Sequence, residues 1–215
     1  MQVLTRATPY DAVIVGSGAT GGWVAKQLSE AGLTVAVLDA GSKVTPDQYS
    51  EHVQPFQTKY RFESKAFMRD RPMQRKNYAC EETNYKWWVN DVENPYTYDA
   101  DKEFRWIRLR AVGGRSLAWG RGAFRHSDLD FKAASRDGHG IDWPISYAEM
   151  VPHYETVEKF IGVSGTAENL PQCPDSIFQP ALPMRCGEKR LKEAVWKKFK
   201  RVITEGRSGV LTKPL

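Results

Sequence analysis

Three glycines follow a short apolar run near the start of the chain, in the sequence GSGATG. They are Gly16, Gly18 and Gly21, and Asp39 follows the last of them about 20 residues later. Gly16 would allow a tight turn, Gly18 a close approach of the backbone to a pyrophosphate, and Gly21 close packing of a helix on a strand. Asp39 could accept hydrogen bonds from both ribose hydroxyls of an adenosine. The spacing therefore predicts a dinucleotide-binding loop.

The residues around this motif predict the elements that would position it. Residues 11–15, DAVIV, are apolar and β-branched, which is typical of a buried strand in a parallel sheet. Residues 22–33 have helical spacing, and Gly32 is placed to end the helix. Residues 34–41 predict a second strand. The helix N-terminus would offer N–H groups to phosphates. The alternative is a glycine turn without a ligand, which this order of elements disfavours.

A second glycine cluster, RAVGGRSLAWG, occupies residues 110–120. Gly113 and Gly114 would let the backbone approach a ligand, and Ser116 could supply a hydroxyl. FAD is long enough to need two such approaches, whereas a nicotinamide dehydrogenase has no obvious need for the second. Asp39 argues against NADP, because a carboxylate repels a 2′-phosphate, but it does not separate NAD from FAD. The alternative is a glycine pair in a bulge or corner.

Three stretches carry a resemblance to a known family. They are YDAVIVGSGATGGWVAKQLSEAGLTVAVLDAG (10–41), VGGRSLAWGRGAFRHSDLDF (112–131) and GIDWPISYAEMVPHYETVEKFIGVSG (140–165). Together they resemble the glucose–methanol–choline (GMC) oxidoreductases, in the branch of pyranose oxidases and bacterial sugar or glycoside dehydrogenases. The resemblance implies an α/β fold: a Rossmann-like FAD-binding domain with the start of an α+β substrate domain. It also implies oxidation of CH–OH groups of sugars, glycosides or other alcohols, with hydride transfer to flavin N5 and an unknown electron acceptor.

The motifs and the resemblance together assign candidate contacts to FAD. These are Gly16, Gly18, Ala19, Thr20 and Gly21 at the pyrophosphate, Asp39, Ala40 and Gly41 at the adenosine, and Val112, Gly113, Gly114, Ser116 and Trp119 along the ribityl chain and ring. Ala118 stands where pyranose oxidases have a histidine that links to FAD, so non-covalent binding is expected. Trp119 stands where many members have asparagine, so contacts at the flavin edge are expected to differ.

The resemblance also divides the chain into four segments. Residues 1–43 and 104–165 are expected to form the two parts of the FAD-binding domain. Residues 44–103 are expected to be an insertion or lid, and residues 166–215 the start of a truncated substrate domain. Within residues 44–103, WWVND is a candidate short strand.

A catalytic residue is not assigned. In the family the catalytic histidine and its partner lie near the C-terminus of longer chains, and none of His52, His126, His139 and His153 matches that position. The resemblance therefore implies an N-terminal fragment that is inactive alone, with the catalytic base unknown. The alternative is a non-catalytic dinucleotide-binding module, or one subunit of a split assembly.

Two later helices are predicted. Ser146 is a candidate N-cap with Glu149 three residues on, which is the capping-box spacing, and Gly162 is a natural stop. The stripe between them, from Tyr147 to Ile161, is expected to be core packing. Residues 188–203 are basic and amphipathic. A solvated surface helix is favoured there over a helix that binds a membrane surface or an anionic partner.

Composition bounds the class of protein. The net charge is +5, and most of the excess lies between residues 185 and 207, without the basic, aromatic face that a nucleic-acid binder often has. The three cysteines, Cys80, Cys173 and Cys186, have no metal-type spacing, so neither a metal site nor a disulfide scaffold is expected. No signal-peptide pattern or membrane-length apolar run is found, and a cytoplasmic location is expected by default.

Overall fold

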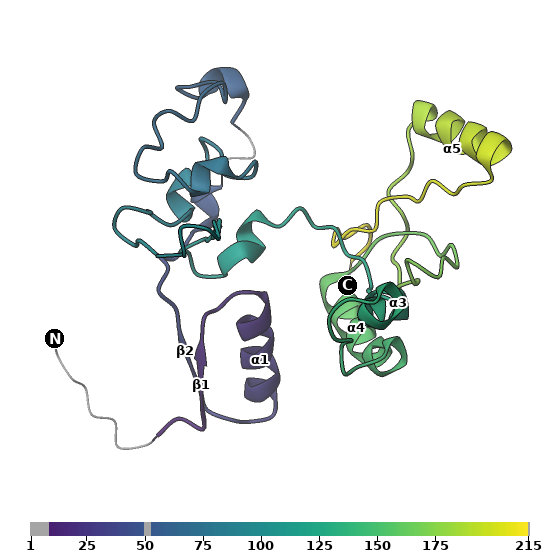
Figure 1. Cartoon of the computed structure of the whole chain (residues 1–215), viewed down its shortest axis with the longest axis horizontal. Helices are drawn as coiled ribbons and strands as arrows, with labels where there is room; N and C mark the ends of the chain where they lie inside the picture. Colours follow the sequence, from purple (N-terminus) through teal and green to yellow (C-terminus); the bar gives the residue numbers. More distant parts are fainter. Residues whose placement is uncertain (1–8, 50–52, 215) are drawn as a thin grey trace. The chain divides into compact units, whose positions relative to one another are not determined.

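The computed structural model describes residues 9–49 and 53–214, so His52 lies outside the described residues. The chain divides into two compact units, Met1–Trp119 and Gly120–Leu215, which are described separately below (Figure 1). Among the described residues, no helix has both the length and the apolar character needed to cross a bilayer. The four-segment division expected from the sequence remains a prediction.

The first unit begins with a strand–helix–strand unit. Strand β1 (Ala12–Val15) is followed by helix α1 (Ala19–Glu30) and strand β2 (Val35–Leu38). The two strands pair in parallel, with Ala12 opposite Val35 and Val15 opposite Leu38. Gly32, with a φ of +85°, turns the chain out of α1 as expected. The predicted order of elements is confirmed.

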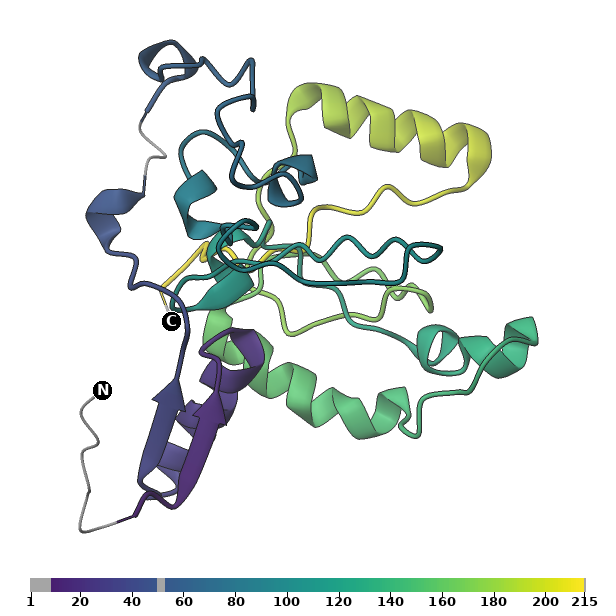
Figure 2. The ribbon, with the colours of Figure 1, turned by 60° about the vertical axis from the view of Figure 1, so that its left-hand side comes forward.

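Helix α1 covers one face of these two strands. A Cβ placed on Gly21 in α1 would lie 3.3 Å from Cγ2 of Ile14, so Ile14 faces the helix. Figure 2 shows the two strands side by side with α1 behind them. The opposite face carries Val13, Val15 and Leu38, which are 59%, 84% and 56% exposed. The expectation that the first strand is buried on both faces is therefore wrong for this face.

The rest of the first unit consists of loops and single turns. The 3₁₀ turns are η1 (Pro46–Gln48), η2 (Pro55–Gln57), η3 (Gln74–Lys76), η4 (Tyr85–Trp87) and η5 (Gly114–Ala118). A small core of Met68, Cys80 and Trp88 lies in this part, and Tyr85 of η4 and Ala118 of η5 pack against it. The candidate strand at WWVND is reduced to one antiparallel bridge between Trp88 and Leu109, because Trp87 ends a 3₁₀ turn.

In the described part of the second unit, the elements longer than single bridges are all helices. Its helices are α2 (Asp128–Phe131), α3 (Ala133–Asp137), α4 (Tyr147–Ile161) and α5 (Cys186–Phe199). The capping box of α4 is confirmed: the backbone N–H of Glu149 donates to Ser146 Oγ (3.3 Å), and the backbone N–H of Ser146 donates to Glu149 Oε2 (2.7 Å). Gly162 ends α4 as predicted. The predicted basic helix is α5, with bounds earlier than the expected 188–203.

The stripe along α4 is not wholly apolar. Glu158, which falls in that stripe, is buried and accepts hydrogen bonds from the buried guanidinium of Arg125 at 2.7 and 2.5 Å. The pKa of Arg125 is raised above its ordinary value, first by the hydrogen bonds that it donates to Glu158. An ion pair therefore joins α4 to the segment before α2, within the second unit.

Candidate dinucleotide-binding site

The first glycine loop, Gly16–Gly21, connects β1 to α1. Gly16 has a φ of +90°, a conformation that a residue with a Cβ adopts only under strain. A Cβ on Gly21 would lie 2.0 Å from the carbonyl oxygen of Gly16. The local backbone thus requires glycine at both positions for the two reasons that the motif predicted.

Gly18 lies at the N-cap of α1. Its backbone is extended, with φ −66° and ψ −171°, and glycine has no side chain with which to cap the helix. The first turn contains no acidic side chain. Because the N–H groups of a helix's first turn lack partners within the helix, this end of a 12-residue helix attracts an anionic group.

Asp39 follows β2 and accepts three hydrogen bonds. Its Oδ2 accepts from the backbone N–H of Ser17 (2.8 Å) and from Ser17 Oγ (2.5 Å), and its Oδ1 accepts from the backbone N–H of Gly41 (2.7 Å). The bond from the Ser17 hydroxyl, then those from the backbone of Gly41 and Ser17, lower the pKa of Asp39 below its ordinary value. Asp39 is therefore a carboxylate at neutral pH.

These bonds also limit what else Asp39 can accept. A carboxylate offers about four acceptor positions. Three are used within the protein, and Oδ1 is the oxygen with the single bond. In this arrangement Oδ1 keeps an acceptor position free, and the expected acceptance from both ribose hydroxyls stays a prediction.

The second glycine loop, the cluster at residues 110–120, contacts the first through Gly113 and Gly114. The backbone N–H of Gly113 donates to Ser17 Oγ at 2.8 Å. A Cβ on Gly114 would lie 3.4 Å from Cα of Gly18, and a Cβ on Gly18 would lie 3.9 Å from the carbonyl oxygen of Gly113. Gly113 and Gly114 have φ values of +96° and +55°. Folding of the first unit thus brings the two glycine loops into contact.

The end of β2 holds the second glycine loop in place. Ser42 and Ala111 form a parallel bridge, and the backbone N–H of Val112 donates to the carbonyl of Ser42 at 2.9 Å. Arg110 Nε donates to the carbonyl of Ala40 at 3.1 Å. A Cβ on Gly41 would lie 2.3 Å from the backbone nitrogen of Ala111, so only glycine permits this approach.

Most of the predicted site residues meet at this edge of β1 and β2. The residues brought together are Gly16, Gly18, Gly21, Asp39, Ala40, Gly41, Val112, Gly113 and Gly114. Ala19 and Thr20 lie in the exposed first turn of α1. Ser116 Oγ donates within its own loop to the carbonyl of Gly113 (2.6 Å), and Trp119 follows η5 and is 45% exposed, so the contacts of both residues to FAD stay predictions.

Sequence reasoning missed Ser17 and Arg110. Ser17 contacts both Asp39 and Gly113, and Arg110 bonds the carbonyl of Ala40. The signal for Ser17 was its place as the single polar residue between Gly16 and Gly18. Arg110 stands beside a quoted motif, but nothing in its spacing shows which carbonyl it contacts.

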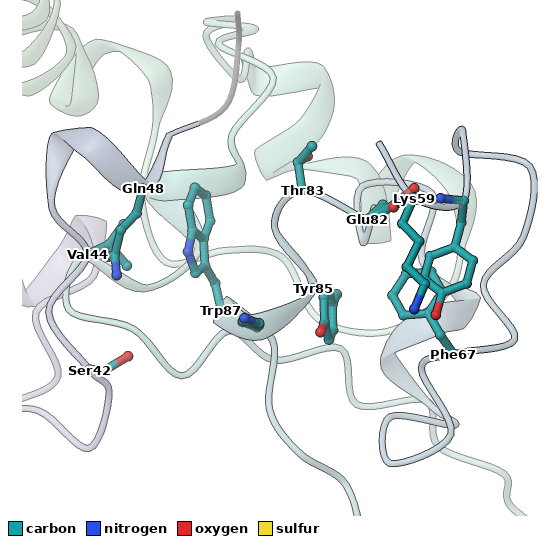
Figure 3. Close-up of a pocket in the computed structure, with 11 residues that line it drawn as sticks. Ser42, Val44, Gln48, Lys59, Phe67, Glu82, Thr83, Tyr85 and Trp87 are labelled. Carbon is teal, nitrogen blue, oxygen red and sulfur yellow. Dashed lines mark hydrogen bonds between the residues drawn. The ribbon is translucent and has the colours of Figure 1, made fainter. Parts of the chain in front are cut away.

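A pocket of about 830 Å³ in the first unit begins at Ser42, just past Gly41 (Figure 3). Ser42, Val44 and Gln48 lie at one end, Lys59, Phe67 and Glu82 at the other, and Tyr85 and Trp87 between them. Tyr60 stacks on Phe67 with ring centroids 4.2 Å apart. Sequence analysis assigned no site residue to this region, because its aromatic residues follow no regular spacing.

A family model described as an NAD(P)-binding Rossmann-like domain matches residues 14–70. This match contains the first glycine loop, α1, β2 and Asp39. It agrees with the strand–helix–strand unit of the structure, and the fold of this part of the chain is Rossmann-like.

Three curated relatives extend the match beyond that unit. The fructose dehydrogenase large subunit of Gluconobacter japonicus is 28% identical over 87% of this chain and 34% of its own length. The 2-methyl-1,2-propanediol dehydrogenase of Mycolicibacterium austroafricanum is 27% identical over 80% of this chain and 27% of its own. The gluconate 2-dehydrogenase flavoprotein of Pantoea cypripedii is 27% identical over 77% of this chain and 27% of its own.

The chain thus spans between about a quarter and a third of the length of these relatives. Each alignment covers more than three quarters of this chain, so each must extend over the second glycine loop. The structure contains the Rossmann-like strand–helix–strand unit that the first glycine loop predicted. By sequence, the chain is similar to oxidoreductases of the GMC type.

Proposed function

We propose that this chain binds FAD across its two glycine loops, as the cofactor-binding part of an oxidoreductase that acts on CH–OH groups of sugars, glycosides or other alcohols. The observation that carries the proposal is the contact between the loops. Gly18 and Gly114 approach each other with no side chain between them, and Ser17 links Asp39 to Gly113. Two bare stretches of backbone at one helix N-terminus suit a long ligand with a pyrophosphate in its middle.

The residues present fit the parts of FAD. Gly16 and the first turn of α1 would hold the pyrophosphate, since their N–H groups and the helix dipole favour negative charge. The ionised Asp39 would accept a ribose hydroxyl through Oδ1. The backbone from Val112 to Gly114 would lie along the ribityl chain, and Trp119 near the ring.

Bound FAD would supply the acceptor for the hydride that leaves the alcohol carbon. The chain's own residues bind and orient it. Ala118 has no nucleophilic side chain, so the proposal is for non-covalent binding. His126, His139 and His153 are exposed residues of the second unit, and none is assigned as the catalytic base.

The relatives support the reaction class. Their names describe dehydrogenases of fructose, of a diol and of gluconate, and one is called a flavoprotein. Fructose and the diol bear CH–OH groups, which is the chemistry proposed for the protein to which this sequence belongs. The division into residues 1–43, 44–103, 104–165 and 166–215 is part of the same proposal.

Titration of the purified chain with FAD tests the proposal, with NADH titrated separately against tryptophan emission. The informative variant is Gly18→Ala. Its Cβ would meet no atom closer than 3.9 Å and Gly18 has a negative φ, so the folded protein tolerates the change, yet the methyl group would enter the space between the loops. Gly187→Ala is the control, because its Cβ would meet nothing within 4 Å and Gly187 belongs to α5 of the second unit rather than to either glycine loop.

We expect saturable FAD binding that Gly18→Ala weakens at least tenfold and Gly187→Ala leaves unchanged. Binding of NADH without FAD would contradict the proposal. So would a Gly18→Ala variant with undiminished FAD affinity.

A non-catalytic dinucleotide-binding module is the second candidate. It is favoured by one observation: the groups that converge at the site are backbone N–H groups and one carboxylate, which bind rather than react. The test is to add fructose or a diol to the FAD-loaded chain. Bleaching of the flavin absorbance would rule out the module and also the expectation that this chain is inactive alone, whereas a bound flavin that stays oxidised favours the module.

A further inference from the structure

Ser17 occupies the one point where the two glycine loops and Asp39 meet. Its hydroxyl donates to Asp39 Oδ2 at 2.5 Å and accepts from the backbone N–H of Gly113 at 2.8 Å. Its own backbone N–H donates to the same oxygen of Asp39 at 2.8 Å. A single side chain thus connects the adenosine end of the proposed site to the loop assigned to the flavin end.

The direction of these bonds is fixed by the charge on Asp39. An ionised carboxylate only accepts, so the single proton of the Ser17 hydroxyl must point to Asp39. The lone pairs of Ser17 Oγ are then turned to the N–H of Gly113. A hydrogen bond to a charged acceptor is stronger than a neutral one, and successive bonds in such a chain polarise one another. Asp39 therefore sets the position of Gly113 through Ser17.

We infer that Ser17 is a positioning residue that couples the two ends of the site, an inference that rests on the proposed FAD function. When Asp39 binds the adenosine half of the ligand, Ser17 orders the second glycine loop for the flavin half. Gly113 and Gly114 have positive φ values and no side chains to hold them. Glycine loses more freedom on ordering than any other residue. A bond from Ser17 reduces the ordering cost that a ligand must otherwise meet when it binds there.

The same contact shapes ligand recognition at Asp39. Oδ2 of Asp39 accepts two hydrogen bonds from Ser17, and Oδ1 accepts one from the backbone of Gly41. Removal of the hydroxyl frees part of Oδ2, while the backbone bond from Ser17 remains. Ser17→Ala should therefore weaken the flavin end of the site without weakening the adenosine end.

The test compares ADP, which reaches only the adenosine and pyrophosphate positions, with FAD, which reaches both loops. Calorimetry gives the two affinities for the full chain and for Ser17→Ala, Ser17→Thr and Ser29→Ala. Threonine keeps the hydroxyl. Ser29 is an exposed residue near the other end of α1 and serves as the control. Amide NMR of Gly113 gives the second readout.

We expect Ser17→Ala to bind FAD roughly tenfold more weakly, as the loss of a charge-assisted contact predicts, and to bind ADP as well as the parent chain. ADP should shift the Gly113 amide in the parent chain but not in Ser17→Ala. Ser17→Thr should restore both properties, and Ser29→Ala should change neither.

Equal losses of ADP and FAD affinity in Ser17→Ala would overturn the inference, because a purely structural role weakens both ligands alike. Unchanged FAD affinity would overturn it too. If the parent chain binds ADP but not FAD, the proposed FAD function fails and the inference fails with it. The first two outcomes concern the affinities of Ser17→Ala and reject the inference alone. The third concerns the parent chain and rejects the proposed FAD function.

Discussion

Two adjacent glycines in α1 allow a sharp test of how the first glycine loop packs. A Cβ on Gly21 would lie 2.0 Å from the carbonyl oxygen of Gly16 and 3.3 Å from Cγ2 of Ile14. A Cβ on Gly22 would have its nearest neighbour, the carbonyl oxygen of Ser17, at 3.4 Å. The two positions share one helix and one chemistry, and differ in the space available for a methyl group.

The magnitudes follow from that difference. Replacement of glycine by alanine within a helix gains up to about 1 kcal/mol. Gly22→Ala should keep most of this gain, since 3.4 Å is close to an ordinary contact. Gly21→Ala must move backbone by more than 1 Å, and overpacking of this kind costs about 1–3 kcal/mol or more. We expect Gly21→Ala to be less stable than Gly22→Ala by about 2 kcal/mol.

Urea unfolding monitored by circular dichroism measures the difference. With a denaturant slope of about 2 kcal/mol per M, the midpoint of Gly21→Ala should lie about 1 M below that of Gly22→Ala. The FAD affinity of Gly21→Ala should fall as well, because the loop that holds the pyrophosphate is displaced. Equal midpoints for the two variants would refute the packing of α1 on the glycine loop described above.

Three further predictions concern charged and titratable groups. The folded state lowers the pKa of Asp39, so its carboxylate stabilises the fold above the ordinary carboxyl pKa, and this stabilisation is lost as the pH falls through the lowered value. The difference in stability between the parent chain and Asp39→Asn should therefore shrink on acidification. A difference in urea midpoints that does not change with pH would contradict this prediction. Arg125→Met leaves the buried Glu158 without its ion-pair partner, so the free energy of unfolding, measured in urea, should fall by about 3–5 kcal/mol. A fall of less than about 1 kcal/mol would contradict the buried ion pair. Burial raises the pKa of the Cys80 thiol to about 11, so a thiol reagent at pH 8 should modify the exposed Cys186 much faster than Cys80. Equal rates of modification, measured by mass spectrometry, would contradict the burial of Cys80.

The local parts of this fold could be read from the sequence because their signals are local. The strand, glycine turn, helix and second strand depend on residues that are near one another in the chain. So does the capping box, where Ser146 and Glu149 are three residues apart. In each case the residue type satisfies a nearby backbone requirement, which spacing alone reveals.

Contacts between distant segments could not be read in this way. Ser17 and Gly113 are 96 residues apart; the sequence predicted that their two loops hold one ligand, but not which atoms join the loops. The stripe of α4 was expected to be core packing, and the ion pair of Glu158 could not be predicted because its partner Arg125 comes from another segment. Val15 was expected to be buried, yet it is 84% exposed, because burial depends on what packs on the second face of the sheet.

A crystal structure of the full chain with FAD tests the central claim most directly. The account predicts one FAD molecule with its pyrophosphate at the N-terminus of α1, a ribose hydroxyl on Asp39 Oδ1, and its ribityl chain beside Gly113 and Gly114. An FAD molecule that touches only one of the two glycine loops, or that binds elsewhere on the chain, would contradict it.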